Sequence, residues 1–69
     1  MPLTMAQTGV EQVIRKIGGK DDTKRFLENL GFTVGGNVII VSEMAGNMIV
    51  SIKDTRVAIS KSIANRIMI

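Results

Sequence analysis

The chain has 69 residues, 45% of them hydrophobic, and its nine Lys and Arg against six Asp and Glu give a net charge of +3. This length allows one domain, residues 1–69, and excludes a second. The absence of Cys and His excludes disulfides and thiolate nucleophiles, and it removes the usual side-chain ligands of transition metals.

The first predicted element is a strand over residues 10–17. Residues 1–10 form a lead-in, in which Thr4 is expected to cap one short turn before Gly9. Gly18-Gly19 ends the strand, because glycine tolerates the backbone angles of a turn. The apolar–polar alternation along the strand is imperfect. The residues predicted on one face are Val13, Arg15 and Ile17.

Residues 21–30 are predicted to form the one good helix. Asp21 or Asp22 is expected to cap its first N–H groups and to complement the positive end of its dipole. Gly31 fits the left-handed position just past the helix, and Phe32 is then expected to fold back onto Leu27 in a Schellman ending. The residues predicted on the buried face are Phe26, Leu27 and Leu30.

After a turn at Gly35-Gly36 the chain becomes β-rich. Residues 37–43 are β-branched and apolar on both faces, which predicts a strand covered on both sides. A hairpin turn at residues 45–47 leads into a strand over residues 48–53. The residues of this strand predicted to point inward are Met48, Val50 and Ile52.

The last part of the chain is predicted to complete the sheet. A tight turn at Asp54-Thr55 leads into a strand over residues 56–60, with Val57 and Ile59 facing inward. Residues 60–64 form one helical turn, capped by a serine at position 60 or 62, and residues 67–69 form a short final strand.

This order of elements predicts a mainly β fold, a small SH3-like barrel of about five strands. One helix is inserted after the first strand, and a short helical turn precedes the last. Strands this short cannot stand as an open sheet, whereas a closed barrel hides both the strand edges and the core. No repeat, linker or low-complexity segment interrupts residues 1–69.

Candidate chemical sites in the sequence have simpler structural explanations. Without His or Cys there is no general base near neutral pH, so we predict no enzyme and no catalytic residue. Helix capping explains Asp21-Asp22 better than a hard cation does, and core filling explains Met48 better than Cu(I) binding. Gly18-Gly19-Lys20 lacks the outer glycine and the following Ser or Thr of a phosphate-binding loop. We therefore expect no metal site and no cofactor.

With catalysis and metal binding set aside, binding of a partner is the function that remains. The amino-acid composition limits the classes of partner that the chain can bind. The chain has no Trp or Tyr, and both Phe are assigned to the packing of the helix. Aromatic platforms for stacking bases, and aromatic grooves for Pro-rich peptides, are therefore missing. This argues against nucleic acid and against the familiar ligand of SH3 domains. Recognition through aliphatic surface, strand edges and modest charge is what the residues favour.

A further pattern runs nearly from end to end of the chain. It comprises Met1-Pro2-Leu3, Gly9, Leu30-Gly31-Phe32, Gly35, the strand 37–42, Gly46, the strand 49–53, Arg56-Val57-Ala58-Ile59, Ala64 and Ile67. This pattern resembles the FeoA family, the small cytoplasmic accessory proteins of bacterial ferrous iron transport. Its positions are mostly glycine and aliphatic, so the order and total length carry the resemblance.

The resemblance implies an SH3-like barrel that partners FeoB, a membrane permease with a cytoplasmic G-protein domain. It carries over no catalytic residue and no metal ligand. Many relatives have a longer, Pro-containing turn where this chain has residues 43–47. The family is also similar to the C-terminal module of iron-dependent repressors. A nucleic-acid-binding or metal-responsive regulatory module is therefore the alternative function.

Two sets of residues are candidates for partner binding. The first is Met44 in the hairpin loop, with Lys53 and Arg56 beside the next turn, because an exposed Met is adaptable and cations steer an acidic partner. The alternative is that all three are ordinary solvated residues. The second set is Leu27 and Leu30, which would line an apolar cleft beside the helix, although a small domain favours placing them in its core.

The predicted location is the cytoplasm, without membrane insertion. The opening Met1–Met5 lacks the basic and long apolar stretches of a signal peptide. The longest pure apolar run, residues 38–41, is far shorter than the ~20 residues that span a bilayer. The oligomeric state is left open by the sequence.

Overall fold

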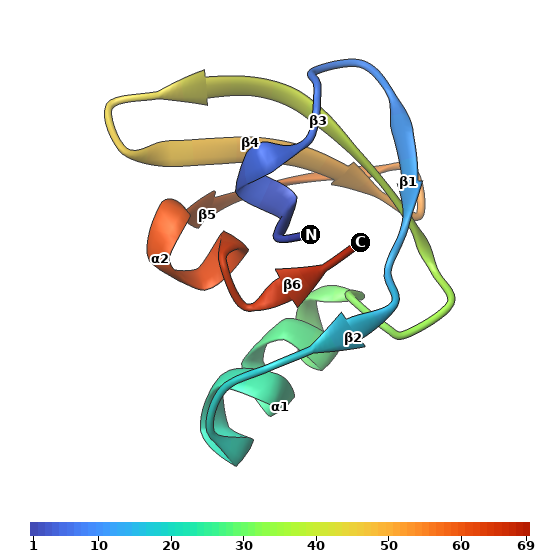
Figure 1. Cartoon of the computed structure of the whole chain (residues 1–69), viewed down its shortest axis with the longest axis vertical. Coiled ribbons are helices and arrows are strands. Elements are labelled where there is room, and N and C mark those ends of the chain that lie inside the picture. Colours follow the sequence, from blue (N-terminus) through green and yellow to red (C-terminus); the bar gives the residue numbers. More distant parts are fainter.

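The computed structural model describes residues 1–69 and arranges six strands in two sheets (Figure 1). One sheet has four antiparallel strands in the order β1-β3-β4-β5, and the other pairs β2 with β6. The mainly β fold, with its single long helix and its helical turn before the last strand, is confirmed. The elements are η1 (Leu3–Met5), β1 (Glu11–Val13), β2 (Lys16–Ile17), α1 (Asp21–Leu30), β3 (Asn37–Met44), β4 (Asn47–Ile52), β5 (Thr55–Ser60), α2 (Lys61–Ala64) and β6 (Ile67–Met68).

The strand predicted over residues 10–17 is two strands, which belong to different sheets. The Ile14 amide donates to the Gly36 carbonyl at 2.9 Å, whereas the next amide, of Arg15, donates to the Met68 carbonyl at 2.8 Å. The chain therefore changes partners between these two residues, and the side-chain alternation shifts. Ile14 and Ile17 are both buried while Val13 is 49% exposed, so the predicted shared face was wrong.

Helix α1 has the predicted bounds, Asp21–Leu30, but not the predicted cap. Lys20 occupies the N-cap position, and no side chain caps the helix. Asp21 and Asp22 lie inside the first turn. Their carboxylates therefore act on the helix dipole rather than as caps.

The C-terminal end of α1 is the predicted Schellman motif. Gly31 has a φ of 107°, and the Phe32 amide donates to the Leu27 carbonyl at 2.9 Å. Phe32 is thereby turned inward and has no exposed area. Phe26, predicted on the buried face, is 48% exposed. One residue advances a helix by about 100°, so Phe26 cannot share the inward direction of Leu27.

Strand β3 is covered on one side more completely than on the other. Val38 and Ile40 are buried, whereas Ile39 and Val41 on the opposite side are half-buried. The predicted cover on both sides was therefore wrong, because the core cluster that contains residues of α1, β2 and β6 includes only Val38 and Ile40 of β3. The pairing of β3 with β4 also contains a bulge between Ile40 and Ser42.

Two-residue turns connect the last three strands of the larger sheet. Ala45 and Gly46 join β3 to β4 with φ angles of 46° and 85°. Lys53 and Asp54 join β4 to β5 with φ angles of 46° and 64°. The second turn lies one residue earlier than the predicted Asp54-Thr55. Positive φ at both positions is typical of type I′ turns, whose twist matches that of the strands.

Ala45→Asn is expected to stabilise the protein by about 0.5–1 kcal/mol, because asparagine tolerates the left-handed conformation that strains alanine. Ala45 is exposed and ends no helix, so the change alters little else. Urea unfolding followed by circular dichroism measures the effect. Gly46→Ala is the opposite control and should lower the free energy of unfolding. Equal stability of the two variants would contradict this account of the turn.

The two ends of the chain meet beside β6. Pro2 forms a β-bridge with Met68, and the Ile69 amide donates to the Met1 carbonyl at 2.7 Å. Thr4 lies within η1 and donates to Asn65 Oδ1 at 2.6 Å, so its predicted role as a cap was wrong. The termini therefore lie side by side, as Figure 1 shows.

Helix α2 starts as predicted, because the Ser60 hydroxyl accepts a hydrogen bond from the Ile63 amide at 3.3 Å. One hydrophobic cluster of 13 buried residues fills the space between the sheets and α1. Met48, Val50 and Ile52 point into it, as predicted. Neither α-helix has the length and apolar character needed to cross a bilayer.

Candidate partner-binding surface

The interior of the protein contains no polar or charged side chain. All 13 buried residues are hydrophobic, and no group of three or more Asp and Glu side chains gathers where it could hold a metal ion. Every polar and charged side chain of the structure is therefore at least partly exposed to solvent.

The outer side of the larger sheet carries a row of aligned residues, one from each strand. Strand pairing places Glu11 opposite Ile39, Ile39 opposite Ser51, and Ser51 opposite Arg56. Directly opposed residues point to the same side of a sheet. The row therefore places a carboxylate at one edge and a guanidinium at the other, with an aliphatic side chain and a hydroxyl between them.

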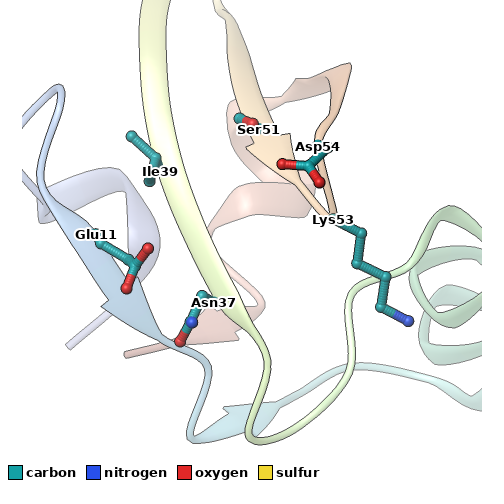
Figure 2. Close-up of a pocket in the computed structure, with 6 residues that line it drawn as sticks. All are labelled: Glu11, Asn37, Ile39, Ser51, Lys53 and Asp54. Atoms are coloured by element: carbon teal, nitrogen blue, oxygen red, sulfur yellow. The ribbon is translucent and has the colours of Figure 1, made fainter.

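A shallow pocket of about 280 Å³ opens along this row. Asn37 from β3 and the turn residues Lys53 and Asp54 extend its lining beyond the row (Figure 2). Ile39 is its only hydrophobic residue. Two carboxylates, an amide and a hydroxyl thus gather around one aliphatic side chain, while the Lys53 ammonium at the rim points away from it toward α1 (Figure 2). Such a surface suits polar recognition of another protein.

The turn at the rim of this pocket is held in a costly conformation. Lys53 and Asp54 both have positive φ, which is favourable for glycine and tolerable for aspartate but strained for lysine. A Cβ placed on Gly31 would lie 3.8 Å from the Lys53 Cδ. Lys53 therefore extends along the C-terminal end of α1, whose last turn has no cation of its own. Its charge complements the negative end of that helix.

Three of the residues predicted for partner binding are exposed, and the structure places Lys53 and Arg56 near one pocket but Met44 away from it. Lys53 lines the pocket, and Arg56 stands in the row that the pocket follows. Met44 is 66% exposed and ends β3, where it pairs with Asn47. The full length of β4 separates it from Lys53. The predicted surface is thus two surfaces at opposite ends of the sheet.

Leu27 and Leu30 do not line an open cleft. Leu27 has no exposed area and belongs to the core cluster, and Leu30 is half-buried against that cluster. Neither residue lines either of the two hollows in the surface. Leu27 can reach a partner only if the protein opens.

The sequence interpretation missed the four polar residues that share the pocket with Lys53. These are Glu11, Asn37, Ser51 and Asp54. Each has an ordinary place in a strand or turn, so no local pattern marks it. Only the register of three strands, which brings residues 40 positions apart in sequence to one point, could have revealed the group.

The sequence and the structure of this chain are similar to those of known proteins. A sequence profile described as the FeoA domain matches residues 1–69. A candidate Fe(2+) transport protein A of Methanocaldococcus jannaschii is 28% identical over 68 residues, which cover 99% of this chain and 83% of that protein.

Solved structures show the same architecture. An iron uptake regulatory protein (FeoA) is 30% identical with a TM-score of 0.88, over 97% of this chain and 89% of that one. The FeoA of Stenotrophomonas maltophilia, crystallised with zinc and described as a procaryotic SH3 domain protein, is 26% identical with a TM-score of 0.85, over 99% and 87%. A manganese-dependent transcriptional repressor shares the fold alone, at 18% identity and a TM-score of 0.87, over 97% and 39%. These structures confirm the predicted SH3-like fold.

Proposed function

Because the chain belongs to the FeoA family, we propose that it is a non-enzymatic accessory protein of ferrous iron uptake. In this proposal it binds the cytoplasmic side of a FeoB-type permease, which has a G-protein domain, and modulates or assembles that permease. Fe(2+) is the cargo of the permease, and this chain acts through contact with the protein that carries it.

The observation that carries the proposal is the match of the family profile from the first residue to the last. An interior without polar groups, and a surface with shallow hollows instead of a deep cleft, support contact over catalysis. General acid–base chemistry needs a donor and acceptor within hydrogen-bond reach in a recessed site.

The outer face of the larger sheet is the proposed contact with the permease. Arg56 forms no ion pair, because the only one in the structure joins Lys61 Nζ to Glu43 Oε2 at 3.6 Å. Its guanidinium is therefore available to a carboxylate of the partner. Met44 is proposed as a second, separate contact at the far end of the sheet, where its flexible side chain can adapt to an apolar surface.

Arg56→Glu is expected to weaken binding of the permease's cytoplasmic domain about tenfold, because a partner carboxylate would then meet a like charge. A pull-down followed by titration calorimetry measures the loss. Arg25→Glu on the exposed side of α1 makes the same change of net charge and should bind nearly as the unaltered protein does. If Met44→Asp, Lys53→Glu and Arg56→Glu all bind like the unaltered protein, the proposed surface is wrong.

The mode of action is tested by co-purification with and without a guanine nucleotide. A modulator of the G-protein domain should bind one nucleotide state at least several-fold more tightly than the other, because only differential affinity can shift an equilibrium. An assembly factor should bind both states equally. No binding in either state would overturn the proposed partner.

A second candidate function is a nucleic-acid-binding or metal-responsive regulatory module. The shared fold of the manganese-dependent repressor and the net charge of +3 favour it. Binding of nucleic acid through phosphates would weaken steeply as salt is added. The absence of any DNA or RNA mobility shift at low salt would remove the nucleic-acid form of this alternative.

A further inference from the structure

The excess positive charge of the protein is confined to one part of it. Residues 15–28 together with Arg66 contain six cations and three carboxylates, whereas the rest of the chain contains three of each. Arg66 belongs with this group because its carbonyl accepts a hydrogen bond from the Gly18 amide at 2.7 Å. The net charge of +3 therefore lies beside β2 and α1, and the outer sheet face is locally neutral.

A hollow of about 430 Å³ lies in this basic region, between β2, α1 and the loop that follows α1. We call it the β2–α1 groove. Three cations line it, Arg15, Lys16 and Lys24, together with one carboxylate, Glu28. Its apolar residues are Ile17, which is buried, and Val34, which is 65% exposed.

The cations of the groove are not neutralised within the protein. The single ion pair of the structure joins Lys61 to Glu43, outside the groove. No carboxylate oxygen therefore lies within 4.0 Å, the limiting distance of an ion pair, of a side-chain nitrogen of Arg15, Lys16 or Lys24. Three unpaired like charges around one hollow repel each other, and an anionic occupant would relieve that repulsion.

We propose that the β2–α1 groove binds an acidic, extended segment of a partner protein. Carboxylates of the segment pair with Arg15, Lys16 and Lys24, while an aliphatic side chain covers Val34. This surface is distinct from the outer sheet face, so the inference goes beyond the proposed function and stands without it.

The lining of the groove favours a peptide over other anionic ligands. Neither Phe lines the groove, so no aromatic ring is available there to stack a base of a nucleic acid. Val34 offers apolar area that a phosphate backbone would leave uncovered. The cations surround a hollow instead of standing on a flat face, which a membrane surface would require.

The experiment uses fluorescence anisotropy with a labelled peptide of repeated Glu-Glu-Val triplets at low salt. The unaltered protein should bind it, and added salt should weaken the binding because the charges are solvent-exposed. Lys16→Glu/Lys24→Glu should weaken it by about tenfold or more, whereas Glu28→Gln should strengthen it about two-fold. Val34→Ser should weaken binding of this peptide more than binding of a peptide with Val replaced by Gly.

The control is Arg25→Glu/Lys61→Glu, which makes the same change of net charge outside the groove and should change the affinity less than about three-fold. Circular dichroism confirms that each variant is folded. No peptide binding by the unaltered protein, or equal losses in the groove and control variants, would overturn the proposal. Tighter groove-dependent binding of a single-stranded oligonucleotide or of vesicles containing phosphatidylserine would also overturn it, in favour of that ligand.

Discussion

Phe32→Ala is expected to unfold a large part of the protein at room temperature. Phe32 is the largest of the fully buried side chains, and it has no exposed area. Truncating a buried Phe costs about 3–5 kcal/mol. A core in a chain of this size supplies net stability of about the same amount. The loss therefore consumes most or all of the free energy of unfolding.

Phe26→Ala is the matched control, because it removes the same atoms from a side chain that is 48% exposed. It should cost less than about 1 kcal/mol, as surface substitutions usually do. Urea titrations followed by circular dichroism give both values. Similar losses for the two variants would show that Phe32 is not the centre of the core.

Leu27→Gln is expected to have the second largest effect, a loss of about 3–4 kcal/mol. Leu27 has no exposed area, and the core around it contains no polar side chain to satisfy an amide. The variant therefore loses apolar burial and also leaves polar groups without hydrogen-bond partners. Thermal melting should show a transition far below that of the unaltered protein.

The same variant distinguishes the two interpretations of Leu27. A folded Leu27→Gln protein that no longer binds the permease's cytoplasmic domain would make Leu27 a contact residue, contrary to its burial. Leu27→Met, which nearly conserves volume, should cost less than about 1.5 kcal/mol and leave binding unchanged.

Features set by neighbours in sequence were predictable. The bounds of α1, the left-handed Gly31 and the bond from Phe32 back to Leu27 all follow from a stretch of chain shorter than fifteen residues. The inward face of β4 followed from simple alternation. Ser60 capped α2 for the same local reason. Such signals need no knowledge of what packs against them.

Features set by distant segments were not predictable. The strand predicted over residues 10–17 is interrupted after Ile14, because the Ile14 amide donates to the Gly36 carbonyl whereas the following amide donates to the Met68 carbonyl. The pocket on the outer sheet face depends on the register that brings Glu11 and Ser51 to either side of Ile39. Both require the pairing of segments far apart in the chain, which residue patterns alone do not supply.

The meeting of Met1 with Ile69 has a practical consequence for engineering. A short linker could join these ends into a ring, since the backbone already connects them by hydrogen bonds. New ends could then be opened at the exposed Ala45-Gly46 turn, giving a circular permutant with the same strand pairings. If the domain were inserted into a surface loop of a host protein, the two ends of the opened loop would stay close together, because the ends of the domain are adjacent.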